Sequence, residues 1–88
     1  MDEPTGDQGY RFEVVCQLLR LSPATLRRYE RQGLVSPRRS GRTSLYSDVE
    51  LRRLRRIRRL TVDLGVNLAG VEIIMRLVER LERESSAG

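Results

Sequence analysis

LSPATLRRYERQGLVSPRR, residues 21–39, is the stretch of this sequence that decides its fold. Ser22 followed by Pro23 is typical of a helix start, because a serine side chain caps the first free amides and proline needs no amide there. Gly33 can take the left-handed conformation that ends a helix. We therefore expect a helix over residues 23–32.

A shorter apolar segment precedes this helix. Residues 13–19 carry apolar side chains at helical spacing, and so short a helix must pack on a neighbour to be stable. Residues 20–22 separate the two segments, and two helices joined by so short a turn form a helix-turn-helix. The second helix is then the recognition helix. On it, Leu26 and Tyr29 point one way, and Ala24, Arg27, Arg28 and Arg31 share roughly the opposite face.

The next segment, residues 34–46, predicts a β-hairpin, because turn-forming proline, serine and glycine lie between stretches that favour strand. Such a hairpin after a helix-turn-helix is a wing; the alternative is an ordinary solvated loop. We expect Leu34 and Val35 in the first strand, Leu45 and Tyr46 in the second, and Arg38, Arg39 and Arg42 at the tip.

Two further helices follow. Ser47 and Glu50 predict a capping box, in which each residue satisfies a backbone donor of the other, and Gly65 is expected to stop this third helix. Asn67 is the candidate cap of the last helix, which runs to about residue 84. Its apolar arc is wider than a surface helix needs, so one side is left exposed and suits a partner. We expect that partner interface at Ile73, Leu77 and Leu81.

The resulting fold class is mainly α with one small β-hairpin. It is a winged helix-turn-helix domain of four helices and one wing, and we expect it to span residues 10–84. Residues 1–9 are acidic and polar and predict a disordered tail. Residues 85–88 predict a frayed C-terminus.

Positive charge is concentrated in the middle of the chain. Fourteen of the seventeen arginines lie between Arg11 and Arg59 against four acidic residues, so this segment carries +10 while the whole chain carries +5. Nucleic-acid phosphate is the usual polyanion that neutralises so compact a charge. No lysine occurs, and the planar fork of arginine suits both phosphate and guanine. A genomic preference for arginine codons would explain the missing lysine, but it would not explain the clustering.

The composition excludes several classes of function. The chain has no histidine and one cysteine, Cys16, which lies in an apolar run and is expected in the core. We therefore expect no disulfide within the chain, no metal site and no cofactor. Nucleophilic catalysis normally needs a nearby base, most often histidine, so we expect no enzyme. Neither a signal peptide nor a membrane-spanning run is apparent, which predicts a cytoplasmic protein associated with the nucleoid.

Three stretches together resemble the MerR family of bacterial winged-helix transcription regulators. They are residues 21–39, LYSDVELRRLRRIRRL at 45–60 and LGVNLAGVEII at 64–74. The runs GLVSPRR, DVELRRL and GVNLAGV are most similar to its heat-shock repressor branch, HspR. The resemblance covers about residues 11–78. Family members usually continue into a long coiled coil that pairs two subunits, and often into an effector domain; we expect this chain to lack both.

The resemblance implies that the recognition helix lies in the major groove of double-stranded DNA and that the wing touches the flanking backbone. Arg27, Tyr29 and Glu30 match the family motif RxYE, and Tyr46 matches the wing tyrosine. Ser44 stands where relatives commonly have arginine. The DNA-binding residues that we expect are Ser22, Ala24, Thr25, Arg27, Arg28, Tyr29 and Arg31 in the recognition helix, Arg38, Arg39, Arg42, Ser44 and Tyr46 in the wing, and Arg52, Arg53, Arg55 and Arg56 in the third helix.

The function that we expect is sequence-specific regulation of transcription, as a repressor of stress or heat-shock genes. Binding to an inverted repeat needs two subunits, so a homodimer through the last helix is the candidate assembly. Two alternatives use the same fold. One is a modulator that binds a chaperone instead of DNA, and the other is a recombination accessory factor that bends DNA.

Overall fold

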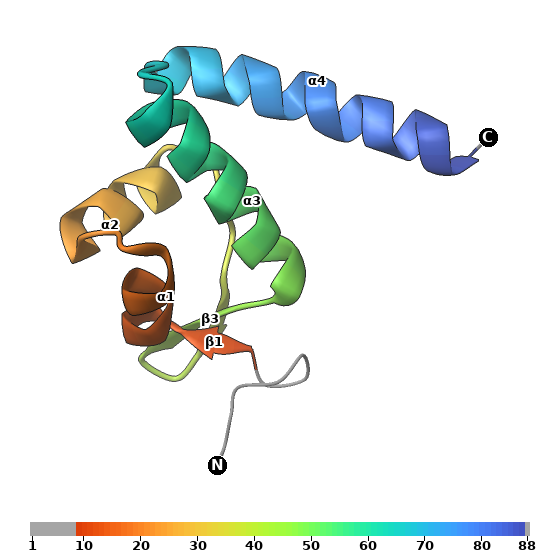
Figure 1. The fold of residues 1–88 in the computed structure, drawn as a ribbon. Coiled ribbons are helices and arrows are strands. Elements are labelled where there is room, and N and C mark those ends of the chain that lie inside the picture. Colours follow the sequence, from red (N-terminus) through yellow and green to blue (C-terminus); the bar gives the residue numbers. More distant parts are fainter. Residues whose placement is uncertain (1–8, 88) are drawn as a thin grey trace. The chain divides into compact units, whose positions relative to one another are not determined.

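The computed structural model describes residues 9–87 of the 88-residue chain, so the expected tail lies outside the described residues except for Gly9. The chain is mainly helical with one small sheet, which confirms the predicted fold class (Figure 1). It divides into two compact units, Met1–Arg55 and Arg56–Gly88. Its elements are β1 (Tyr10–Arg11), α1 (Phe12–Leu19), α2 (Pro23–Arg31), β2 (Arg38–Ser40), β3 (Thr43–Tyr46), α3 (Asp48–Arg58), the π-helical segment η1 (Arg59–Asp63) and α4 (Leu68–Ala87).

The predicted helix-turn-helix is present in the first unit. α1 packs against α2, and three residues join them. Ser22 caps α2 as expected, because its Oγ accepts the Thr25 amide at 3.1 Å. Gln32 is the C-cap of α2, and Gly33 follows with a φ of 76°. The predicted glycine stop is therefore confirmed, with the helix one residue shorter than expected.

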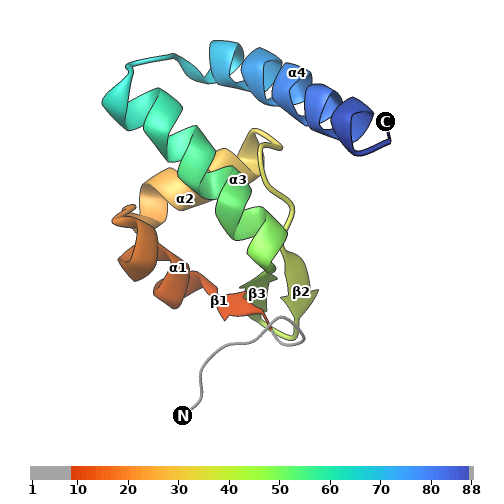
Figure 2. The same cartoon turned by 45° about the vertical axis from the view of Figure 1, so that its right-hand side comes forward.

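A three-stranded antiparallel sheet accompanies these helices. Its order is β1-β3-β2, so β3 is the central strand. Figure 1 shows β1 beside β3, and Figure 2 brings β2 into view on the other side of β3. The predicted hairpin consists of β2 and β3 alone. The third strand, β1, has only two residues, which are too few to show a strand pattern in the sequence.

The turn of the hairpin is tighter than the sequence predicts. Ser40 pairs with Thr43, which leaves only Gly41 and Arg42 in the turn. Two-residue hairpin turns favour glycine with a positive φ at their first position, and Gly41 has a φ of 64°. The prediction of three arginines at the tip is therefore wrong for the two that lie in β2.

Leu34 and Val35 also differ from expectation. They lie in the loop after α2 and outside any strand, yet they are only 3% and 2% exposed. Their apolar side chains belong to the core of the first unit. The apolar character of these two residues therefore reflects burial and not strand pairing. That core is completed by Val15, Leu19, Leu21, Leu26, Tyr29, Tyr46, Leu51 and Leu54.

α3 begins at the predicted cap. The Ser47 Oγ accepts the Glu50 amide at 3.2 Å. The Glu50 carboxylate, however, accepts the Ser36 amide at 3.3 Å, which differs from the reciprocal contact of a capping box. This bond ties the loop before the wing to the first turn of α3.

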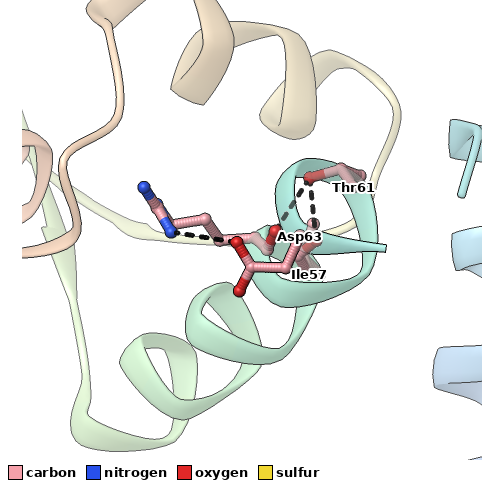
Figure 3. Close-up of polar contacts among 4 residues, drawn as sticks. Ile57, Thr61 and Asp63 are labelled. Atoms are coloured by element: carbon pink, nitrogen blue, oxygen red, sulfur yellow. Dashed lines mark hydrogen bonds and ion pairs between the residues drawn. The ribbon is translucent and has the colours of Figure 1, made fainter. Parts of the chain in front are cut away.

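α3 changes its winding after Arg58, where η1 begins. The Thr61 hydroxyl donates to the main-chain carbonyls of Ile57, at 2.9 Å, and of Arg58, at 3.3 Å (Figure 3). Arg58 also lies 4.0 Å from Asp63. The sequence predicts a regular helix to Leu64, but a threonine hydroxyl that bonds to main-chain carbonyls competes with the regular helical pattern.

α4 is the long helix of the second unit. Asn67 caps it as predicted, because its Oδ1 accepts the Gly70 amide at 2.8 Å. The helix continues to Ala87, beyond the expected end near residue 84. Val71 and Met75, which are 0% and 1% exposed, lie on its buried side.

The turn between α1 and α2 contains a strained residue. Arg20 has a φ of 55° and is the one non-glycine among the described residues with a positive φ. It forms the C-cap of α1, where its amide donates to the Cys16 carbonyl. The left-handed conformation costs a residue with a Cβ about 1–2 kcal/mol. The turn geometry therefore imposes a local cost that glycine would avoid.

We expect the Arg20→Gly variant to be more stable than the Arg20→Ala variant by about 1 kcal/mol, because only alanine keeps a Cβ in the left-handed conformation. Both substitutions remove the same charge, so their difference reports the backbone alone. Urea unfolding of the two variants measures it. Equal stabilities would contradict the assignment of strain to this turn.

Candidate nucleic-acid interface

The outer face of α2 presents two arginines beside a small residue. Ala24, Arg28 and Arg31 are exposed, and their spacing of four and three residues places them on one stripe. Leu26 and Tyr29, on the opposite side, are 0% and 2% exposed. The division of this helix into a core face and a basic face is as predicted. A small residue one turn before two arginines lets the helix approach a groove closely while the guanidinium groups reach base edges or phosphates.

Arg27 is exposed but turns toward α1. Its guanidinium carbon lies 4.6 Å from the centroid of the Phe12 ring, which is within the range of a cation–π contact. The sequence predicts Arg27 among the DNA-binding residues of the recognition helix, and that contact stays a prediction. In the structure its guanidinium contacts Phe12 and so links the two helices of the helix-turn-helix.

The hydroxyls of Ser22 and Thr25 form hydrogen bonds at the N-terminus of α2. Ser22 Oγ donates to Thr25 Oγ1 at 2.8 Å, while it accepts the Thr25 amide at 3.1 Å. The sequence lists both among the DNA contacts. Their first role in the structure is to fix the start of α2, although the Thr25 hydroxyl keeps its own proton to donate.

Three of the expected contact residues are buried. Tyr46 is 0% exposed, Tyr29 is 2% exposed and Ser44 is 7% exposed. Side chains with so little exposed surface offer a phosphate little to contact unless the fold opens. Their contact with DNA stays a prediction; in the structure their side chains pack inward and support the residues that surround them.

Tyr46 and Ser44 take part in a polar cluster that joins α2 to the wing. The Tyr46 hydroxyl donates to Glu30 Oε2, which connects β3 to α2. Arg39 Nη1, on β2, donates to Ser44 Oγ at 3.0 Å. Burial raises the pKa of the Glu30 carboxyl, and the guanidinium groups of Arg27 and Arg39 oppose this shift. The charges of both arginines therefore act on the same carboxylate. We use the name helix–wing junction for five residues: Arg27, Glu30, Arg39, Ser44 and Tyr46.

Exposed arginines continue beyond α2. Arg38 lies in β2 and Arg42 in the hairpin turn, and both are exposed. On α3, Arg52 and Arg55 are exposed and three residues apart, whereas Arg53 is partly buried. All five lie in the first unit, as α2 does.

Arg56, the last of the expected contacts on α3, lies in the second unit. Its Nη2 is 2.9 Å from Glu82 Oε2, in an ion pair within that unit. A carboxylate already neutralises this guanidinium, so we leave Arg56 out of the candidate interface.

Phe12 and Glu30 belong to the site although the sequence suggests no role for the first and only a motif position for the second. Both act through contacts with residues on other elements, which periodicity does not reveal. The one local signal is the isolation of Glu30, because no other acidic residue lies between Glu13 and Asp48.

Within the described part of the chain, no group of three or more histidine, cysteine, aspartate or glutamate residues could hold a metal ion, and no helix is long and apolar enough to cross a membrane. Cys16 is free and partly buried. Burial raises the pKa of its thiol, with Glu13 adding to the shift. The thiol therefore stays protonated and is a poor nucleophile.

Comparison with known proteins gives two matches. Residues 10–78 match the family of MerR helix-turn-helix regulatory proteins. The chain is also similar to a protein of Streptomyces coelicolor named putative heat shock protein HspR, with 46% identity over 69 residues. The aligned part is 77% of this chain and 46% of that relative, so the chain spans about half of the relative's length.

Glu30 makes the stability of the fold depend on pH. Because burial raises its pKa in the folded chain, the folded state holds the Glu30 proton more tightly than the unfolded state does. The resulting stabilisation, relative to a Glu30→Gln variant, is fully present below the unfolded pKa and is lost as pH rises through the raised folded value.

Urea unfolding of the parent and of Glu30→Gln from about pH 4 to pH 7 tests this, since the range spans the ordinary pKa of glutamate. We expect the stability of the parent to fall relative to that of the variant as pH rises. A relative stability that increases with pH would contradict the direction of the shift.

Proposed function

The chain belongs to the MerR family of helix-turn-helix regulatory proteins, and from this premise we propose that it binds a specific site on double-stranded DNA. Family membership makes it a transcription regulator and not an enzyme. α2 is the helix that we assign to the major groove, and the β2–β3 hairpin is the wing that we assign to the flanking backbone.

The observation that carries this proposal is the set of exposed arginines that α2, the wing and α3 contribute to one compact unit. Arginines that neutralise phosphates release condensed counterions, which supplies much of the affinity for a duplex. Phosphate contacts position a protein, whereas contacts with base edges give specificity. We assign base reading to Ala24 and Arg28 and phosphate contact to Arg31, Arg38, Arg42, Arg52 and Arg55.

We further propose that the regulated genes are heat-shock or other stress genes and that the protein represses them. The support is the 46% identity with the relative named as heat shock protein HspR. The identity lies in the part that the two chains share, and that part includes the helix-turn-helix and the wing.

A homodimer through α4 would bring two recognition helices to one operator. Ile73, Leu77 and Leu81 are 58%, 53% and 64% exposed and lie four residues apart, so they form one apolar stripe. An exposed apolar stripe on a helix suits another apolar surface. A second copy of the chain is the occupant that a two-fold symmetric operator requires.

The same stripe also favours a second candidate function, a module that binds a chaperone. That function would not need the exposed arginines of α2 and the wing. A protein that recovers a chaperone from cell lysate and shifts no duplex at low salt would reverse the ranking. DNA bending by a recombination accessory factor, the third candidate, would appear as a bent operator in a permutation assay.

Selection of bound duplexes from a random pool tests the main proposal. We expect an enriched sequence with two-fold symmetry that binds two chains, with the stoichiometry measured on the winning duplex. A pool that yields no enriched sequence at low salt would contradict specific binding.

Two arginine variants should separate base reading from phosphate contact. Arg28→Ala is expected to cost about 1–3 kcal/mol on the selected duplex and to relax base preference. Arg42→Ala is expected to weaken all duplexes about equally and to lower the salt slope by about one unit. The control is Arg76→Ala, which makes the same charge change on α4, where Arg76 pairs with Glu72 at 3.1 Å. Titrations in which all three variants behave alike would contradict these assignments.

A charge placed in the apolar stripe should break the dimer. We expect Leu77→Glu to shift the chain to a monomer in sedimentation and to weaken binding to the selected duplex, because a buried carboxylate would lack a partner. Leu18→Glu is the control, since Leu18 is another exposed leucine, at 51%, on α1. If both variants sediment like the parent, α4 is not the interface.

A further inference from the structure

We propose that Glu30 is a positioning residue for DNA recognition, whose carboxylate holds α2 against the wing through the Tyr46 hydroxyl. This inference rests on the proposed function. Under this proposal Glu30 contributes to specific binding through the position of α2, although its negative charge repels phosphate.

The contact with Tyr46 sets the relation of α2 to the wing. Tyr46 is 0% exposed, so solvent cannot serve as the hydrogen-bond partner of its hydroxyl in the folded chain. A buried tyrosine hydroxyl needs an acceptor, and Glu30 supplies it from a position sixteen residues earlier in the chain. Because the bond joins α2 to β3, it fixes the recognition helix relative to the central strand of the sheet.

Two arginines share the same carboxylate. The guanidinium carbon of Arg27 lies 4.6 Å from the centroid of the Phe12 ring, and Arg39 Nη1 donates to Ser44 Oγ at 3.0 Å. The positive charges of both arginines act on the Glu30 carboxyl. Each guanidinium thus has a neutral partner, and the charge of the same carboxylate attracts both. The junction therefore keeps α2, which carries Arg28, in a fixed relation to the hairpin, which carries Arg42.

The other effects of the Glu30 charge are unfavourable. Seven arginines and no acid other than Glu30 lie between Glu13 and Asp48, so its negative charge reduces the attraction of this segment for any duplex. Its partial burial also disfavours the ionised form. Neither general affinity nor the stability of the ionised fold accounts for a carboxylate here, whereas the geometry of the helix–wing junction does.

The test compares Glu30→Gln with Glu13→Gln in the full chain. Both remove one negative charge from the first unit and keep the shape of the side chain, but Glu13 is exposed in the first turn of α1, outside the junction. Each variant is titrated against the duplex recovered by selection and against a shuffled duplex of the same length. On the shuffled duplex, both variants should bind slightly more tightly than the parent, because each gains positive charge.

On the selected duplex the two variants should part. Glu13→Gln should again bind slightly more tightly, whereas Glu30→Gln should bind about tenfold more weakly than Glu13→Gln, the loss expected when a charge-assisted contact that sets geometry is removed. If the parent distinguishes the two duplexes but the variants match each other on both, the inference is overturned and the proposed function stands. If the parent itself does not distinguish them, the proposed function fails first.

Tyr46→Phe provides a second measurement without a charge change. It keeps the buried ring and removes only the hydroxyl, so we expect weaker binding to the selected duplex and unchanged binding to the shuffled one. The double variant with Glu30→Gln should lose less than the sum of the single losses, because both substitutions act on one bond. Additive losses, or equal losses on both duplexes together with a weaker helical circular-dichroism signal, would show a purely structural role and overturn the proposal.

Discussion

The burial of Tyr46 is the constraint on which the first unit depends. Its backbone pairs with Tyr10 in β1, and a side chain at Gly9 would come within 3.1 Å of its carbonyl oxygen. Its hydroxyl donates to Glu30 on α2. One residue thereby connects the first strand, the wing and the recognition helix. The wing therefore does more than offer arginines to solvent, because its inner side supports the helix that we assign to the major groove.

The few acidic residues of the arginine-rich segment have local structural tasks. Glu13 lies in the first turn of α1, and Asp48 and Glu50 lie in the first turn of α3, where negative charge is favourable near free amides. Glu50 also binds the Ser36 amide, and Glu30 binds Tyr46. Since these carboxylates are committed to the fold, the exposed surface of α2 and of the wing is left to arginine.

The second unit follows a different design. Its arginines are largely paired, as Arg56 is with Glu82 and Arg76 with Glu72, and its exposed stripe is apolar. η1 lies at its start, close to the boundary between the units. π-helical segments interrupt regular α-helices and occur frequently at functional sites. The exposed arginines of α2 and the hairpin and the exposed apolar stripe of α4 thus belong to separate units.

Local signals in the sequence determined the helix starts, the glycine stop after α2 and the basic face of that helix, because caps, turns and periodicity involve residues a few positions apart. They also determined the family, since its motifs are contiguous. Only the tertiary structure decided which polar side chains face inward. Tyr46, Ser44 and Arg27 are of residue types that commonly contact DNA. In the structure Tyr46 and Ser44 are buried, and the Arg27 guanidinium lies over the Phe12 ring. Whether a hydroxyl or guanidinium group contacts solvent or another side chain depends on elements that are distant in sequence. A local sequence pattern does not show which distant elements will pack together.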